Sequence, residues 1–288
     1  MKRNTYLYKV LIGAVAATTL LSSCQSEDFG FTKQEVRRTK YDRDFAATFG
    51  QPQEGHQWGF DQEFYTGSTT RASNDTPDLI TNGEIQNFRI MCEDMGDVNS
   101  DFDFNDVVFD VSYNGTDCKV TLQAIGGTLP IMLCYNRQPL SVDGESELHT
   151  AFAAESGKPV NVGAKDGAEP GKKSISVAVD PASFSAKKFS ILVARNPKAP
   201  TETTPSAWYE VSAGGSSPLC ICVPVTTAWC KEGMRIDKAY GNFKDWVQNE
   251  KMDDWTPTDA TKLCDNVDPD TVDGCYSNTD DGNLAPRR

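Results

Sequence analysis

Short apolar runs separated by turn residues fill the chain from residue 85 onward, and this pattern restricts the possible fold more than any other feature. Several runs alternate apolar and polar residues, as strands with one buried face do. The runs are Ile85–Cys92, Val107–Tyr113, Cys118–Ala124, Pro130–Tyr135, Ser174–Val179, Phe189–Ala194, Ser206–Val211 and Leu219–Val223. With little helix between them, they predict a mainly β fold, an antiparallel, jelly-roll-like β-sandwich with one or two short helices.

Two segments carry helical spacing instead. Tyr41–Phe49 places apolar residues at positions 41, 45, 46 and 49 and is followed by Gly50. Ile236–Val247 places apolar residues at positions 236, 240, 243 and 247. Both spacings predict a short helix with one buried face. Between two of the apolar runs, Asn114-Gly115 is typical of a tight hairpin turn.

The first 24 residues have the layout of an export signal. Lys2 and Arg3 precede the apolar run Val10–Leu21, and small residues lead to Cys24. A run of this length is too short to cross a hydrocarbon core of about 30 Å as a mature helix. Leu-Ser-Ser-Cys resembles a bacterial lipobox, which predicts a signal peptide over 1–23 and lipidation of Cys24. An ordinary signal cleaved elsewhere is the alternative.

Lipidation predicts where the protein acts. Gln25-Ser26-Glu27-Asp28 follows Cys24 and resembles the signal that sends lipoproteins of Bacteroidetes to the outer face of the outer membrane. We therefore expect a lipid-anchored outer-membrane protein exposed on the cell surface. A solvated linker is the alternative interpretation of this acidic stretch.

The charge of the chain excludes one class of partner. A net charge of −13 and a pI near 4.6 oppose binding to nucleic acid, because phosphate-tracking proteins need clustered Lys and Arg. Such a charge favours divalent cations over anionic partners.

An acidic segment carries the clearest chemistry. It holds eight carboxylates and no Lys or Arg; the carboxylates are Glu93, Asp94, Asp97, Asp101, Asp103, Asp106, Asp110 and Asp117. Ca²⁺ binds six to eight oxygen ligands, which carboxylates and amide carbonyls supply. We predict a structural Ca²⁺ site; its expected ligands are Asp94, Asp101, Asp103, Asn105 and Asp106. It is not an EF-hand, because Asp106 occupies the sixth loop position, where an EF-hand requires glycine. The alternative is a solvated acidic edge that prevents aggregation.

The remaining cysteines lie mostly in apolar runs. Beyond Cys24 they number eight, an even count that permits disulfides in an exported protein. Their apolar surroundings favour buried free thiols. No Cys-x-x-Cys occurs, which argues against a zinc site.

Candidate catalytic groups are few, and we expect no enzyme. His56 and His149 lie in loop-like stretches without a partner motif, which predicts a surface or turn role for each. Paired carboxylates leave a hydrolase as a third possibility. Trp208-Tyr209 is the pair expected to be exposed and to form a ligand platform.

Several pieces of the chain resemble one family. The first is Arg89–Gly96 with Ser100–Val111, and later pieces follow in order at Gly126–Pro130, Leu219–Pro224, Trp229–Glu232 and Ile236–Val247. They resemble the LruC-type (DUF4842) domain of bacterial lipoproteins over roughly residues 85–265. The resemblance implies a cell-surface β-sandwich with a Ca²⁺ site, and it brings no established activity.

These observations predict an order of segments and a role. The segments are a signal peptide (1–23), a lipid tether (24–40), a helical and aromatic segment (41–84), the β-sandwich domain (85–265) and a loose acidic tail (266–288). The expected role is adhesion, glycan binding or surface assembly, with a glycan or a surface protein as partner. The alternative is a structural subunit of a fimbria-like surface polymer.

Overall fold

The computed structural model describes residues 29–60, 86–94, 100–155, 157–195, 208–213, 216–249 and 255–264, together with two short strands near the C-terminus. The chain divides into two compact units, Met1–Tyr41 and Asp42–Arg288. The predicted signal peptide and Cys24 lie outside the described residues. Within the described part of the chain, no helix combines the length and the apolar character that crossing a membrane requires.

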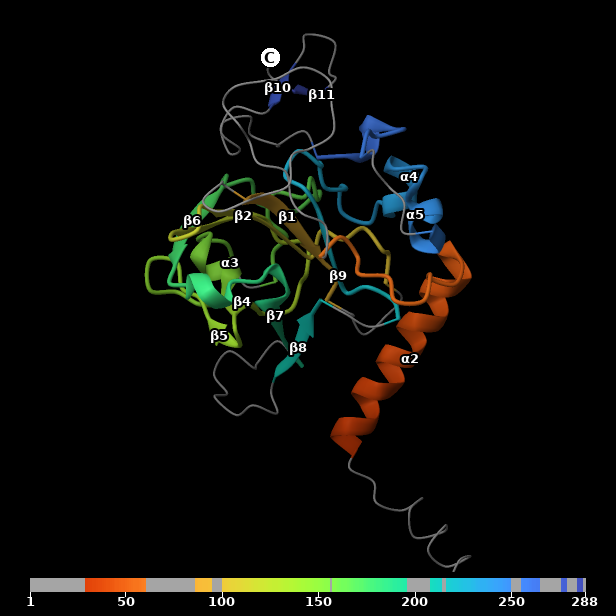
Figure 1. The fold of residues 1–288 in the computed structure, drawn as a ribbon, viewed down its shortest axis with the longest axis horizontal. Coiled ribbons are helices and arrows are strands. Elements are labelled where there is room, and N and C mark those ends of the chain that lie inside the picture. Colours follow the sequence, from red (N-terminus) through yellow and green to blue (C-terminus); the bar gives the residue numbers. More distant parts are fainter. Residues whose placement is uncertain are drawn as a thin grey trace, which may run out of the picture. The chain divides into compact units, whose positions relative to one another are not determined.

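A five-stranded antiparallel sheet forms the first layer of the second unit (Figure 1). Its strand order is β6-β3-β2-β1-β9. The strands are β1 (Gln86–Cys92), β2 (Val107–Tyr113), β3 (Cys118–Ala124), β6 (Lys173–Val177) and β9 (Cys220–Pro224). Every neighbouring pair is antiparallel, so the chain runs as a meander from β1 to β3 before it crosses to β6.

A four-stranded antiparallel sheet in the order β5-β4-β7-β8 forms the second layer. The strands are β4 (Ile131–Tyr135), β5 (Gln138–Pro139), β7 (Phe189–Ala194) and β8 (Trp208–Ser212). Phe109 of β2 packs against Phe189 of β7 with ring centroids 5.6 Å apart, so the two sheets share one apolar core. The predicted β-sandwich is confirmed.

Strand positions follow the apolar runs closely. β2, β3 and β7 have the predicted bounds, and the other five predicted strands differ by one or two residues at one end or at both. Asn114-Gly115 forms the predicted turn between β2 and β3, where Gly115 has φ +92° and its lack of a side chain permits that backbone. The short β5 was not predicted.

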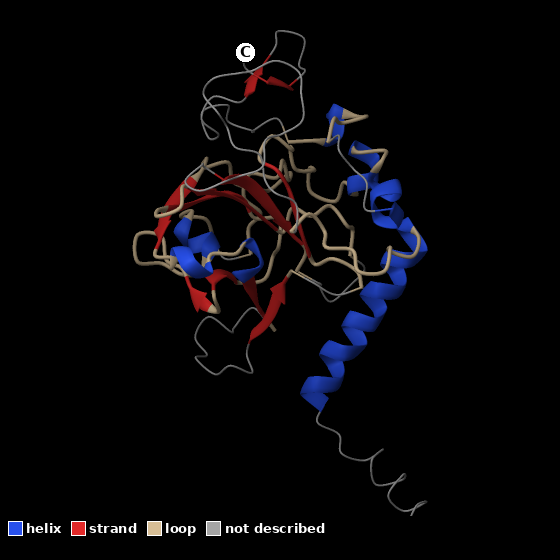
Figure 2. Cartoon of the chain, in the orientation of Figure 1, coloured by secondary structure: helices blue, strands red, loops and turns tan. Residues whose placement is uncertain are grey.

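The helices differ more from expectation (Figure 2). α2 (Phe29–Phe49) begins well before the predicted Tyr41. The predicted helix Ile236–Val247 is two helices, α4 (Ile236–Ala239) and α5 (Phe243–Asn249). The break has a cause: the Ala239 carbonyl accepts the Thr258 backbone N–H, and Gly241 donates to the Thr258 hydroxyl, so both lie outside a helical ladder.

The remaining elements are short. They are α3 (Leu148–Ala151), the 3₁₀ turns η1 (Pro181–Ser183), η2 (Ala186–Lys188) and η5 (Ala260–Lys262), and an antiparallel pair of strands, β10 (Tyr276–Asn278) and β11 (Leu284–Pro286). β10 and β11 lie within the predicted acidic tail (266–288).

An aromatic cluster supports the loop that leads into β2. Phe49 at the end of α2 packs against Phe102 (5.4 Å between centroids) and against Phe243 of α5 (5.1 Å). Phe45 packs edge-on against Trp58 at 5.9 Å. These rings are fully or nearly fully buried, so the cluster fixes the position of the Phe102 loop.

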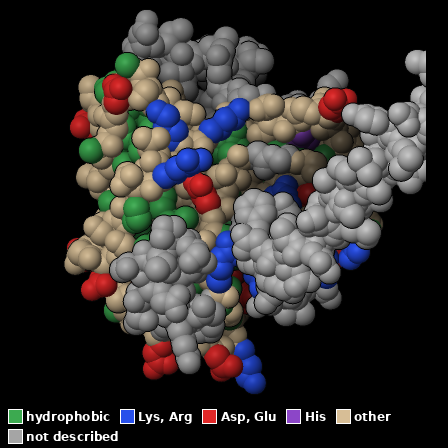
Figure 3. All heavy atoms as spheres, turned by 90° about the horizontal axis from the view of Figure 1, so that it is seen from below, with side chains coloured by type: hydrophobic (Ala, Val, Ile, Leu, Met, Phe, Trp, Pro, Cys, Tyr) green, Lys and Arg blue, Asp and Glu red, His purple; other side chains and the backbone are tan. Residues whose placement is uncertain are grey.

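The outer surface carries both signs of charge. On the face seen in Figure 3, Lys and Arg side chains are interspersed with Asp and Glu over the described residues.

Candidate metal centre

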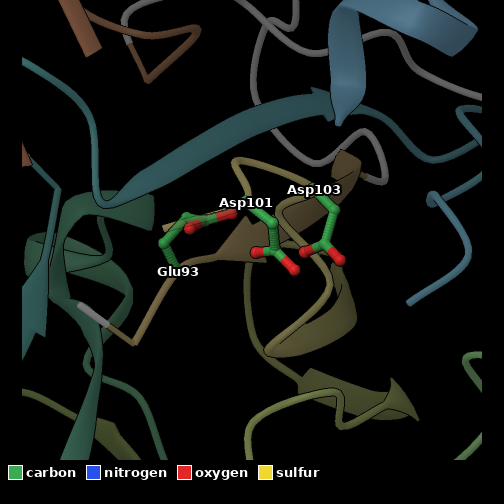
Figure 4. A group of neighbouring side chains, drawn as sticks. All are labelled: Glu93, Asp101 and Asp103. Carbon is green, nitrogen blue, oxygen red and sulfur yellow. The ribbon is translucent and has the colours of Figure 1, made fainter. Parts of the chain in front are cut away.

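Three carboxyl groups meet where β1 ends and β2 begins. One oxygen from each of Glu93, Asp101 and Asp103 lies within 4.8 Å of the other two. Figure 4 shows the carboxyl groups of Asp101 and Asp103 directed toward each other, with Glu93 beside Asp101. The register explains the meeting: Cys92 pairs with Val107, so the residue after β1 faces the loop before β2.

The loop before β2 has an unusual backbone. Phe102 and Phe104 have φ of +57° and +55°, in the left-handed region that bulky residues rarely occupy. Both rings are buried, and Phe102 packs on the aromatic cluster. The apolar side chains thus anchor the loop, and the polar residues between them turn to the opposite side.

Hydrogen bonds fix the carboxylates in place. Glu93 accepts the Phe104 backbone N–H (2.7 Å) and the Ser100 hydroxyl proton. Asp103 accepts the N–H groups of Asn105 (3.2 Å) and Gly233 (2.8 Å). Glu93 and Asp103 are each 1% exposed, so these oxygens are held almost out of water.

Two further oxygens are buried in this region without a hydrogen-bond partner. They are Asn105 Oδ1 and Glu232 Oε2. The Asn105 amide nitrogen donates to the Cys230 carbonyl at 3.1 Å, which orients the side chain and turns Oδ1 away from that carbonyl. Unpartnered buried polar atoms are costly, so these two oxygens are candidate positions for binding a ligand.

A Gly-Gly turn borders these oxygens. A Cβ on Gly126 would lie 2.0 Å from Asn105 Oδ1 and 2.7 Å from Glu232 Oε2. A Cβ on Gly127 would lie 3.2 Å from Asp94 Oδ2 and 3.4 Å from an oxygen of Asp106. The lack of a Cβ at these two glycines therefore lets four oxygen-bearing side chains approach the turn closely.

Asp106 connects this turn with the backbone of Asp94, just after β1. Asp106 accepts the Asp94 backbone N–H at 2.7 Å, and its own carbonyl accepts the Gly127 N–H at 3.3 Å. The Asp94 carbonyl accepts the hydroxyl proton of Tyr209 from the second sheet. The site thus joins both layers of the sandwich.

The carboxyl groups of this region have raised pKa values. Burial, followed by the nearby charge of Asp101, raises the pKa of Glu93 to about 8 and that of Glu232 to about 7. Burial and neighbouring carboxylates also raise the pKa values of Asp103 and Asp106 well above their ordinary values. Each group makes ionisation of the others less favourable.

His149 supports the Gly-Gly turn from behind. Its Nε2 lies 3.0 Å from the Gly127 carbonyl oxygen, and its Nδ1 lies 2.6 Å from Glu147. The ring is fully buried, and His56 is also buried, stacked on Trp58 at 3.7 Å. Of the predicted surface or turn role, the surface part is wrong for both histidines, whereas each ring contacts the backbone of a turn, His149 at Gly127 and His56 at Trp58.

All five predicted ligands lie in this region. Asp103 and Asn105 are buried, Asp106 is half-buried, Asp94 is 8% exposed, and Asp101 is exposed at the rim. Sequence reasoning left Glu93 out of the ligand set, although it belongs to the same acidic segment. It also missed Glu232, which is far away in the chain. The one sequence signal near Glu232 is the piece Trp229–Glu232 of the resemblance described above.

The predicted ligand platform does not form. Tyr209 is 4% exposed, and its hydroxyl group is used by the Asp94 carbonyl. Trp208 is half-buried and packs against Ala194. The expectation of an exposed pair is wrong because the alternation of β8 turns Tyr209 into the core.

Comparisons with known proteins add little to this geometry. No family model matches the chain, and no curated protein matches it. One solved structure is similar at 12% identity and a TM-score of 0.34, covering 69% of this chain and 84% of its own. It is a protein of Bacteroides ovatus whose assignment as a lipoprotein is provisional. Similarity at this level establishes neither a family nor a function.

Proposed function

We propose that the acidic cluster binds a structural Ca²⁺ ion that stabilises the β-sandwich of an exported lipoprotein. The carboxylates of this cluster are Glu93, Asp94, Asp101, Asp103 and Asp106. One observation carries the metal proposal: the unpartnered, buried Asn105 Oδ1 and Glu232 Oε2 lie beside the carboxylates of the cluster. A cation would give both oxygens a partner and would offset the mutual repulsion of the acidic side chains.

The donor chemistry favours a hard cation. The candidate donors are carboxylate and amide oxygens, which suit Ca²⁺, with its six to eight ligands. Neither a thiol nor an imidazole belongs to the donor set, and soft or borderline metals prefer those groups. Asp101, exposed at the rim, is placed to admit the ion and its remaining water ligands.

The position of the site gives the ion a mechanical role. Glu93 follows β1, Asp103 and Asn105 precede β2, and Glu232 follows β9 by eight residues. An ion held by all three segments would connect their ends. A surface protein gains stability from such a connection without a larger core.

The biological part of the proposal rests on the N-terminal sequence. The charged start, the apolar run and Cys24 support lipidation and export to the outer membrane, and Glu27-Asp28 supports exposure on the cell surface. The role we propose is adhesion, glycan binding or surface assembly, without catalysis. A fimbria-like structural subunit is the alternative role.

Unfolding of the full chain in detergent tests the metal proposal. Ca²⁺ at about 100 times its Kd should stabilise the wild type by about 2.7 kcal/mol relative to chelator. The variant with Asp103→Asn and Asp106→Asn should lose this gain. Asp117→Asn is the matched control, because Asp117 belongs to the same acidic segment but lies at the exposed turn after β2. Equal stability of the wild type with and without Ca²⁺ would contradict the proposal.

Metabolic labelling tests the anchor. Cells that express the chain with a labelled fatty acid should yield a labelled protein in the outer-membrane fraction, and Cys24→Ser should abolish the label. Labelling that persists in the Cys24→Ser variant would contradict lipidation at this residue.

A groove in the second unit offers a place to test ligand binding. Its volume is about 440 Å³, and its lining includes Tyr135, Gln138, Ser176 and Asp180. Polar side chains beside an aromatic ring suit a small glycan. Binding on a glycan array with Ca²⁺ should be lost in Ser176→Trp and kept in Lys119→Trp, since Lys119 pairs with Ser176 but lies outside the groove. Equal binding by both variants would exclude the groove as the binding place.

A further inference from the structure

We propose that Cys92 and Cys220 form a disulfide bond between β1 and β9 in the exported chain. Their Sγ atoms lie 3.0 Å apart, about 1 Å more than in a disulfide bond. Both residues are thiols in this structure, and each is 1% exposed. The bond would link residues 128 positions apart in the sequence.

The strand register suits this bond. Cys92 and Cys220 are direct partners in the antiparallel pair β1–β9, and the Glu93 N–H donates to the Leu219 carbonyl at 2.8 Å. That hydrogen bond joins the residues next to the cysteine pair, so the pair itself occupies a non-hydrogen-bonded position. Cα atoms at such positions are about 4.5 Å apart, within the range that a disulfide spans.

Formation of the bond is an ordinary exchange reaction. A small-molecule or protein disulfide, RSSR, reacts with the two thiols, so that one S–S bond forms between Cys92 and Cys220 and one S–S bond breaks. Two RSH molecules leave with the two protons and two electrons of the thiols. Oxidants of this class act outside the cytoplasm, so the inference rests on the export part of the proposed function but not on Ca²⁺.

Burial determines when the bond forms. In the folded sandwich both sulfur atoms are shielded from an external disulfide. Exchange therefore takes place while the chain folds, and the finished bond is then protected from reductants.

Cys222 provides a matched control. It lies two residues beyond Cys220 on the same face of β9, is also 1% exposed, and faces Ile90 across the strand pair. Cys222→Ser removes a thiol of the same burial and should leave the bond intact. Cys220→Ser should remove it.

Peptide mapping of the whole chain tests the inference. The full chain, expressed in cells and isolated from membranes, is alkylated in denaturant without reductant and cleaved after Glu. Residues 85–93 contain Cys92 alone, and residues 211–232 contain Cys220, Cys222 and Cys230, so the two variants identify the cysteine that is joined. We expect these two peptides to be joined in the wild type and in Cys222→Ser, and separate in Cys220→Ser. An exported wild type whose Cys92 peptide is alkylated and separate would overturn the proposal.

A second arm separates this result from a failure of export. The purified chain is reduced in denaturant, refolded with glutathione and its disulfide, and mapped in the same way. The joined peptides are expected here even if the cells do not export the protein. Refolded chain in which residues 85–93 stay separate, or in which they are joined to residues 211–232 through Cys222 or Cys230, would overturn the proposal.

Discussion

Two groups of buried charges lie on the same pair of strands, and they are compensated differently. Asp110 of β2 accepts two hydrogen bonds from Arg89 of β1, at 2.6 and 2.9 Å, and a third from Gln123 at 2.7 Å. Arg89 also lies 5.0 Å from the centre of the Trp229 ring. In this network each buried charge has an opposite charge supplied by the chain itself.

At the end of the same strands, the hydrogen bonds to the carboxyl groups of Glu93 and Asp103 come from backbone N–H groups and a hydroxyl group, where Asp110 has a guanidinium. Neighbouring carboxylates act on one another, and burial with the charge of Asp101 raises the pKa of Glu93 to about 8. By contrast, the hydrogen bond to His149 and backbone N–H groups outweigh burial at Glu147 and lower its pKa to about 2. This difference agrees with our proposal that the cluster binds a cation from outside the chain.

The largest loss of stability is expected when Arg89, the cation that compensates Asp110, is removed. Arg89→Met leaves Asp110 buried without its opposite charge, which should destabilise the protein by about 3–5 kcal/mol in urea unfolding. Ca²⁺ should not restore this loss. The double variant with Asp110→Leu should recover most of it, and equal instability of the single and double variants would contradict the proposed pairing.

Acid should reveal the compensated carboxylate Glu147. Its folded-state pKa is depressed, so its contribution is complete above its ordinary pKa of 4.5 and is lost as the pH falls toward 2. Between pH 5 and 2 the wild type should lose on the order of 2 kcal/mol more stability than Glu147→Gln. Parallel pH profiles of unfolding for the two proteins would contradict this account.

The close approach of the Asn105 side chain to Gly126 should be needed for binding the ion. Gly126→Ala places a methyl group 2.0 Å from Asn105 Oδ1 and displaces that side chain. We expect the affinity for Ca²⁺ to fall at least about 10-fold, or about 1.4 kcal/mol, in calorimetric titration. Asp117→Asn, at the exposed turn after β2, is the control for a substitution outside the cluster. Unchanged affinity in Gly126→Ala would exclude Asn105 as a ligand.

The smallest expected change in stability is informative because its sign should differ between the two groups of buried charges. In chelator, Glu232→Gln removes a charge that repels its neighbours and should stabilise the protein by about 1 kcal/mol or less. Asp110→Asn, which removes a charge that Arg89 attracts, should destabilise it. Chemical unfolding of both variants without metal compares the two groups directly, and destabilisation by Glu232→Gln would contradict the idea that the cluster lacks a cation.

The fold was predictable because the alternation of apolar and polar residues along a strand shows which of its faces is buried. Val107–Tyr113 alternates apolar and polar residues, and its bounds were correct. The helix break at Tyr240–Asn242 depends on Thr258, a contact that no local pattern contains. The burial of Tyr209 likewise follows from which face of β8 meets the other sheet.

The candidate site was predictable only where its residues are adjacent in sequence. Asp101, Asp103 and Asn105 stand at alternate positions and suggested ligands directly. Glu232 reaches the cluster through tertiary structure, and the role of Gly126 depends on the room it leaves for another segment. Spacing along the chain carries no trace of such contacts.

Direct titration of Ca²⁺ into metal-free chain tests the central claim most directly. Calorimetry should show one Ca²⁺ bound per wild-type chain and a large loss of affinity in Asn105→Ala and Glu232→Gln, with Asp117→Asn unchanged. Absence of binding to a folded, metal-free wild type, or equal binding by all these variants, would contradict the assignment of the cluster as a calcium site.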